Sequence, residues 1–191
     1  MLFRSAKVFY TQFYILFGDN SGGTTASSGN WAFYQGSNAS NTTFNSGNDF
    51  AAADVFAALR WTYGASGALT LEYHNASWST ISGCWNQGVV YKVEIMGNNQ
   101  SAGTSSYTYG STSETVPINT YDLWINGNLI SDDLESDGLA NNTNINAITF
   151  IGQSSTSNVA TLFADDFTIY NSIPSSITRS EEHTSELQSP C

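Results

Sequence analysis

The stretch DLWINGNLI, residues 122–130, constrains the fold more than any other part of the chain. Its Asn126-Gly127 pair, set between two apolar arms, is the strongest short-range signal for a two-residue type I′ β-hairpin. With this pair as the turn, we expect Ile125 opposite Asn128, Trp124 opposite Leu129 and Leu123 opposite Ile130. Alternation then gives two apolar faces, one with Tyr121, Leu123, Ile125 and Ile130, the other with Trp124 and Leu129 beside Asp122. Such a ribbon is covered on both sides, or one side meets a ligand.

The rest of the chain predicts short strands separated by turn residues, as in all-β sandwiches. Val8–Phe17 is rich in β-branched and aromatic residues, and Ala68–His74 alternates between apolar and polar residues. In Val89–Gly97, one face is expected to carry Val89, Tyr91, Val93 and Ile95, and the other Val90, Lys92 and Glu94. Only Asn48–Arg60 could be helical, and its alternating Val55, Ala57 and Leu59 favour a strand nearly as strongly. We therefore expect an all-β, two-sheet antiparallel sandwich.

The charge balance excludes several functions. The net charge is −11, with only five Lys and Arg residues. A nucleic-acid-binding module needs clustered basic residues, and so does a protein held to an anionic membrane surface. No apolar run reaches the length of a membrane-spanning helix. Because charged residues are scarce while Asn, Ser, Thr and Gly are abundant, we expect an extracellular or cell-surface protein.

The C-terminal segment 179–191, RSEEHTSELQSPC, switches abruptly to Glu, His and Gln. RSEEHTSELQS matches the translation of a short-read sequencing adapter, so we interpret residues 179–191 as a disordered, adapter-derived artefact. Without His183 and Cys191 the chain keeps only His74 and Cys84, which is too few for a disulfide or a Cys/His metal cluster. We expect one domain over residues 1–174, a linker over 175–178, and a longer natural protein whose domain begins before Met1 with its first strand.

Three motifs together resemble one family. LWINGNLI, ITFIG and the closing FADDFTIYNSIP, residues 163–174, are similar to the C-terminal half of laminin-G-like, concanavalin A-like lectin/glucanase domains. The similarity is greatest to modules of large secreted bacterial proteins; it is strong over residues 89–174 and weaker back to residue 8. It implies a jelly-roll sandwich within a multidomain chain. It says little of function, because members include lectins, adhesion modules and glycanases.

Two acidic stretches are candidate metal sites. Strict alternation would place Phe163, Asp165, Phe167 and Ile169 on one face, where a carboxylate must be hydrogen-bonded or metal-bound. The resemblance implies a structural calcium ion at Asp165 and Asp166; the alternative is an aspartate that pins a loop through backbone N–H groups. The run SDDLESDG, residues 131–138, offers a second set beside Asp132, namely Asp133, Glu135 and Asp137. Such runs are more often solvated loops.

Catalysis has little support in the sequence. Glycosidases need two carboxylates at a defined separation. The resemblance points to an E-x-D-x-x-E strand in the glucanases, but here Glu94 is followed by Met96 and Asn99, so the pattern is broken. Glu72 and Glu94 could still face each other from different strands. We expect His74 on a polar strand face, Cys84 as a single thiol, and no catalytic residue.

Aromatic residues give the best argument for ligand binding, because their rings stack on the C–H faces of sugars. The candidates are Trp78, Tyr107, Tyr109 and Trp124. We interpret Tyr107 and Tyr109 as lying in a polar loop without apolar neighbours. We therefore expect a non-catalytic carbohydrate-binding or adhesion module, with a polysaccharide or glycoconjugate as partner and calcium as candidate cofactor. The alternatives are a truncated or degenerate glycanase or polysaccharide lyase, and a ligand-free spacer.

Overall fold

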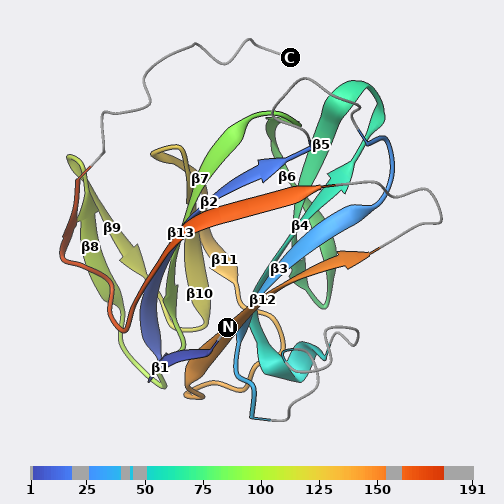
Figure 1. Ribbon diagram of the computed structural model, residues 1–191. Helices are drawn as coiled ribbons and strands as arrows, with labels where there is room; N and C mark the ends of the chain where they lie inside the picture. Colours follow the sequence, from blue (N-terminus) through green and yellow to red (C-terminus); the bar gives the residue numbers. More distant parts are fainter. Residues whose placement is uncertain (1, 19–25, 40–43, 45–50, 154–160, 179–191) are drawn as a thin grey trace.

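The computed structural model describes residues 2–18, 26–39, 44, 51–153 and 161–178, which form an antiparallel β-sandwich with a small third sheet packed on one side. In Figure 1 the three-stranded sheet lies at the left, the five-stranded sheet in the middle and the six-stranded sheet at the right. The prediction of an all-β sandwich is confirmed. None of the described segments is a helix with the length and hydropathy needed to cross a membrane.

The six-stranded sheet has the order β1-β12-β3-β4-β5-β6. Its strands are β1 (Leu2–Ala6), β12 (Ile145–Gln153), β3 (Asn30–Gly36), β4 (Val55–Tyr63), β5 (Ala68–Asn75) and β6 (Ser77–Asn86). A 3-10 turn, η1 (Ala52–Asp54), precedes β4, and a second, η2 (Ala65–Gly67), connects β4 to β5. The described part of the segment that could have been helical is therefore one short turn followed by a strand.

The five-stranded sheet has the order β11-β10-β7-β2-β13. Its strands are β11 (Asn128–Glu135), β10 (Thr120–Ile125), β7 (Val90–Asn98), β2 (Val8–Phe17) and β13 (Leu162–Tyr170). The predicted strand over Val8–Phe17 is confirmed at both ends. Val89 was expected on the inward face of β7, but it precedes the strand and is exposed.

The three-stranded sheet consists of β14 (Ser176–Ile177), β8 (Ser105–Tyr109) and β9 (Thr112–Val116). β8 and β9 form an antiparallel hairpin, and β14 pairs with β8 in parallel. Two of the residues expected in the linker over 175–178 thus form a strand, and Ile177 is buried. The segment expected to be adapter-derived, residues 179–191, lies outside the described residues.

The main core fills the space between the two large sheets. On β2, alternate side chains point inward, with Phe9, Phe13 and Phe17 each completely buried. Phe13 packs against Phe33 of β3 at 4.9 Å between ring centroids, and Phe17 against Trp61 of β4 at 5.1 Å. The opposite face of the five-stranded sheet, which carries the even-numbered residues of β2, is therefore the one available to other partners.

The hairpin between β10 and β11 forms as predicted near its turn. Asn126 and Gly127 have φ values of 50° and 73°, the positive φ at both central positions that a type I′ turn requires. Ile125 pairs with Asn128 and Trp124 with Leu129, as expected. The third pair is wrong, because Leu123 lies opposite Ser131: a β-bulge at Ile130 shifts the register by one residue. The predicted core face, with Tyr121, Leu123, Ile125 and Ile130, is confirmed.

Candidate functional site

The second apolar face of the hairpin is covered by the three-stranded sheet. Trp124, Tyr107 and Tyr109 form a cluster with Tyr10, Met96, Val116 and Ile177. The indole of Trp124 stacks on Tyr109 with ring centroids 3.9 Å apart, and each of these aromatic side chains is at most 4% exposed. The expectation that Tyr107 and Tyr109 lie in a loop without apolar partners is wrong. The residues that pack against them come from strands that are distant in the sequence. The stacked rings of Tyr109 and Trp124 occupy the space that a sugar ring would need.

Tyr107 links the three-stranded sheet to a buried acid on β10. Its hydroxyl donates to Oδ2 of Asp122 at 2.6 Å and accepts a hydrogen bond from Nε1 of Trp124 at 2.8 Å. Asp122 is completely buried. Burial raises the pKa of the Asp122 carboxyl to about 7, although the hydrogen bonds from Tyr107 and from the Asp133 backbone N–H oppose that shift. The carboxyl of Asp122 therefore titrates near neutral pH.

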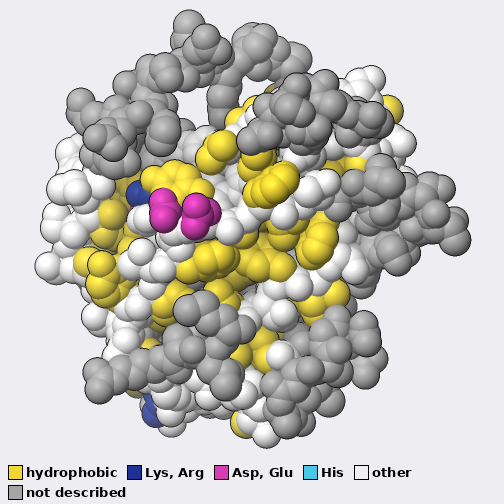
Figure 2. Space-filling view, viewed as in Figure 1, with side chains coloured by type: hydrophobic (Ala, Val, Ile, Leu, Met, Phe, Trp, Pro, Cys, Tyr) yellow, Lys and Arg dark blue, Asp and Glu magenta, His cyan; other side chains and the backbone are white. Residues whose placement is uncertain are grey.

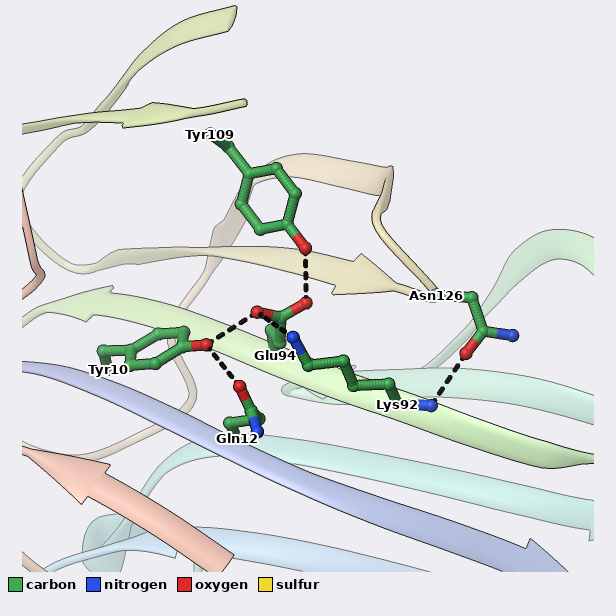
Figure 3. Close-up of polar contacts among 6 residues, drawn as sticks. All are labelled: Tyr10, Gln12, Lys92, Glu94, Tyr109 and Asn126. Carbon is green, nitrogen blue, oxygen red and sulfur yellow. Dashed lines mark hydrogen bonds and ion pairs between the residues drawn. The ribbon is translucent and has the colours of Figure 1, made fainter. Parts of the chain in front are cut away.

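Tyr109 makes the corresponding link to Glu94 on β7 (Figure 3). The Tyr109 hydroxyl donates to Oε2 of Glu94 at 2.6 Å, and the Tyr10 hydroxyl lies 2.6 Å from Oε1. The ammonium of Lys92 is 3.1 Å from the same Oε1 atom. Tyr10 also lies 2.9 Å from Gln12 Oε1, but a hydroxyl has one proton and the carboxylate is the stronger acceptor. Burial raises the pKa of Tyr10, as the Glu94 carboxylate beside it also does.

Glu94 is thus a buried acid whose cross-strand neighbours are Gln12 and Trp124 rather than a second carboxylate. It was expected on a polar strand face with Glu72 as a possible partner. Glu72 lies on β5, where Arg60 holds it through two hydrogen bonds of 2.8 and 2.9 Å, and it points out of the six-stranded sheet. The two glutamates lie on opposite outer faces of the sandwich. The proposed facing arrangement is therefore wrong.

Three aspartates meet where β10 and β11 pair irregularly. Tyr121 pairs with Leu134 and Leu123 with Ser131, so Asp132 and Asp133 both oppose Asp122. The bulge is possible because Asp133 adopts φ = 51°, a conformation that Asp tolerates better than most residues. One carboxylate oxygen from each of the three lies within 4.8 Å of the others, so this group could hold a metal ion. Burial raises the pKa of Asp133, and the negative charge of Asp132 adds to the increase.

The structure places the two sets of acids expected to bind a metal differently from the sequence-based expectation. On β13, Asp165 pairs with Tyr14 and Thr168 with Gln12, so Asp166 and Phe167 share one position of the partner strand. This bulge, with φ = 51° at Asp166, turns Asp165 to the exposed face while Phe167 and Ile169 point into the core. Asp165 is therefore not surrounded by apolar side chains. Its Oδ1 accepts the Asp166 backbone N–H at 2.8 Å.

In the second expected set, the three acids are held apart. Asp133 joins the group described above, whereas Glu135 accepts a hydrogen bond from the Asn75 amide. Asp137 lies 3.0 Å from Nδ1 of His74, and burial raises the pKa of its carboxyl against the opposing effect of His74. A metal site built from Asp133, Glu135 and Asp137 is therefore not supported. His74 lies on the polar face of β5, as expected.

Trp78 lies on the far side of the molecule, on the outer face of the six-stranded sheet. The Arg60 guanidinium carbon is 4.1 Å from the centroid of its ring, and the His74 ring meets it edge-on at 4.9 Å. It packs beside a small cluster that includes Tyr34 and Ala58. Burial raises the pKa of Tyr34 to about 12. Of the four aromatic candidates, Trp78 is the one that is only partly buried.

Cys84 is disulfide-bonded, contrary to the expectation of a single thiol. The other cysteine of the chain, Cys191, lies outside the described residues.

The outer face of the five-stranded sheet also carries a regular set of side chains from Glu94 toward the N-terminal end of β7, some of them exposed and others, such as Leu16, buried. Cross-strand pairing across β7, β2 and β13 places them in rows, because directly paired residues share a face. One row is Val90, Leu16 and Phe163; the next is Lys92, Tyr14 and Asp165; a third is Glu94, Gln12 and Thr168. Val90 and Phe163 are each 52% exposed. We call the first two rows together with Gln12 the open face.

The open face was not predicted from the sequence, although the sequence contains a pattern that indicates part of it. Val8–Phe17 alternates, with phenylalanines at the inward positions and Tyr14 and Gln12 at outward ones. The missing information was the identity of the neighbouring strands: only the pairing with β13 brings Phe163 and Asp165 beside Tyr14. Figure 2, in the view that has β13 at the front, shows a pair of acidic side chains among apolar and uncharged ones, with a basic side chain close by on the left.

Comparisons with protein-family models, with curated proteins and with solved structures found no match to this chain.

Proposed function

We propose that this domain is a non-catalytic carbohydrate-binding or adhesion module of an extracellular protein, and that it binds its glycan on the open face. The observation that carries this proposal is the row Lys92, Tyr14 and Asp165 beside the exposed ring of Phe163. Aromatic rings pack well against the C–H faces of sugars. The ammonium of Lys92, the amide of Gln12 and the carboxylate of Asp165 can form hydrogen bonds with sugar hydroxyls. A flat sheet surface with both kinds of group suits an extended polysaccharide.

The concanavalin A-like, jelly-roll arrangement is part of the same proposal. A five-stranded and a six-stranded antiparallel sheet packed face to face are consistent with it. In this arrangement the open face is part of the outer face of the five-stranded sheet, the sheet that also carries Glu94. The resemblance of the closing strands to laminin-G-like modules adds support but names no ligand.

A glycanase or lyase has less support from the geometry. The two buried acids nearest the open face, Glu94 and Asp122, each accept a tyrosine hydroxyl at 2.6 Å from the three-stranded sheet. A general acid or base must reach the substrate oxygen directly or through one water. Glu94 and Asp122 do not meet this requirement, because both are buried beneath the aromatic cluster and hydrogen-bonded to its tyrosine hydroxyls.

The test is retention of the full chain on a glycan array and on immobilised polysaccharides, once with calcium and once with a chelator. We expect binding, and we expect Tyr14→Ala and Phe163→Ala each to weaken it by about tenfold, the effect of losing one aromatic contact of ~1.4 kcal/mol. Ile118→Ala is the matched control, since Ile118 is 37% exposed and lies between β9 and β10, near Asn98 and so at the opposite end of β7 from Val90. A folded protein that retains no glycan would support the spacer alternative.

A fourth variant tests the other surface. Trp78→Leu removes the partly buried aromatic candidate of the six-stranded sheet, which lies on the opposite outer face. We expect this variant to bind as well as the wild type. Loss of binding in Trp78→Leu, with Tyr14→Ala unchanged, would place the ligand on the six-stranded sheet instead.

A further inference from the structure

We propose that the open face selects uncharged glycans over anionic ones, because Glu94 is a built-in counter-ion that makes Lys92 a hydrogen-bond donor without net charge. This inference rests on the proposed function and names the substrate class of the same site. It concerns the choice between neutral and anionic polysaccharides.

The geometry of Lys92 carries the first step. Lys92 is the one cation in the open face, and its ammonium lies 3.1 Å from Glu94 Oε1 (Figure 3). The Lys92 side chain is 14% exposed, whereas Glu94 is completely buried. An ammonium has three N–H donors, so it can pair with the carboxylate and still offer a proton to a ligand hydroxyl.

The fixed position of Glu94 carries the second step. Tyr109 and Tyr10 hold the two carboxylate oxygens at 2.6 Å each, from β8 and β2. The carboxylate therefore cannot turn away when a ligand approaches Lys92. Because the Lys92 side chain is only 14% exposed, one opposite charge at this distance cancels much of the field of the ammonium.

The remaining charges of the open face complete the argument. Asp165 is exposed, and its Oδ1 accepts a hydrogen bond from the Asp166 backbone N–H. Asp166 is also exposed. An anionic glycan would meet these two carboxylates without a compensating cation, as the whole chain carries a net charge of −11. The other side chains of the open face, Tyr14, Phe163 and Val90, carry no positive charge that would offset this repulsion of an anion.

The first experiment uses the wild-type full chain and polysaccharides sorted by charge: neutral glucans, mannans and galactans, and anionic alginate and pectate. We expect retention by a neutral polymer, at least about tenfold weaker retention by its carboxymethylated derivative, and an affinity for the neutral polymer that changes less than about twofold between low and high salt. Tighter binding of an anionic polymer would overturn the inference and leave the proposed function standing. No binding to any polymer would overturn both.

The second experiment tests the role of Glu94. Glu94→Gln keeps the shape and a carbonyl oxygen for one tyrosine hydroxyl, but it frees the charge of Lys92. We expect this variant to bind the carboxymethylated derivative at least about fivefold better than the wild type, and to lose that gain at high salt. The double variant with Lys92→Met should show no gain.

An equal preference for neutral polymers in Glu94→Gln and wild type would mean that Glu94 does not set the selectivity. Should Glu94→Gln fail to fold, Lys92→Met decides the point alone. It should bind the neutral polymer more weakly, by about two- to fivefold, without changing the ratio of neutral to anionic binding. A changed ratio would show that the charge of Lys92 is not cancelled in the wild type.

Discussion

The hydroxyl of Tyr109 donates a 2.6 Å hydrogen bond to the buried carboxylate of Glu94 and so joins β8 to the middle strand of the five-stranded sheet. Two residues earlier on the same strand, Tyr107 makes the equivalent bond to Asp122 on β10. Alternation along β8 points both tyrosines to the same side, and the buried acids lie on adjacent strands beneath them. The three-stranded sheet is therefore fixed in place by two charge-assisted hydrogen bonds as well as by apolar packing.

Tyr109→Phe should destabilise the fold, because it leaves one oxygen of the buried Glu94 without its donor. We expect the free energy of unfolding to fall by about 1–3 kcal/mol, the cost of an unsatisfied buried polar group. Urea denaturation followed by tryptophan fluorescence measures it. Tyr170→Phe is the control, because Tyr170 is 50% exposed, and its change should stay within about 0.5 kcal/mol. Equal effects of the two substitutions would contradict a structural role for the Tyr109 hydroxyl.

The stability of the fold should decrease as the pH rises toward and through 7, owing to Asp122. Its pKa is raised to about 7 in the folded state, against about 4 in an unfolded chain. A group with a raised folded pKa contributes its full stability below the unfolded pKa and loses it as the pH rises through the folded value. The raised pKa values of Asp133 and Asp137 act in the same direction. Glu72, whose pKa is lowered by Arg60, acts oppositely, below about pH 4.

Asp122→Asn isolates this effect, since the amide does not ionise and can still accept the Tyr107 hydroxyl. Between pH 4 and 8, the wild type should lose on the order of 2–4 kcal/mol relative to the variant. The measurement is urea denaturation of both proteins at several pH values. Parallel curves for the two proteins would show that Asp122 does not titrate differently on folding.

Much of the fold follows from patterns in the sequence, and two of the exceptions share a cause. Alternation predicted β2, and Asn126-Gly127 predicted the hairpin turn. The pairing of Leu123 and the face of Asp165 were predicted wrongly because each lies beside a β-bulge, where one extra residue shifts the register and reverses the side on which the following side chains lie. Asp166 and Asp133 occupy the positive-φ positions of two such bulges, and an Asp in a strand is only a weak signal of one.

The candidate site was harder to predict than the fold. Tyr107 and Tyr109 looked like loop residues because their own segment has no apolar neighbours. Their burial depends on Trp124, Met96 and Tyr10, which come from three other strands. The open face depends in the same way on the order of strands in a sheet. Local sequence carries little information about that order.

Gly97→Ala should strongly destabilise the sandwich. Gly97 lies on β7, and a Cβ atom there would be 2.3 Å from Cζ of the buried Phe9 and 2.9 Å from Cε1 of Phe56. The two rings pack edge to face in the core, so neither can move without opening a gap. We expect a loss of about 1–3 kcal/mol or more. Gly64→Ala is the control, since its nearest contact would be an ordinary 3.5 Å, and its effect should be small.

Calcium should stabilise the wild type more than Asp132→Asn, because the acidic group formed by Asp122, Asp132 and Asp133 is the part of the described chain where three carboxylates converge. In the presence of a chelator, we expect the variant to be the more stable protein by about 0.5–1 kcal/mol, since one of three mutually repelling charges has been removed. Millimolar calcium should reverse that order, because the cation needs several oxygen ligands and the amide is a weaker one. Thermal unfolding of both proteins with calcium, with magnesium and with chelator measures this. An unchanged order in all three conditions would mean that the group is a set of solvated carboxylates without a bound ion.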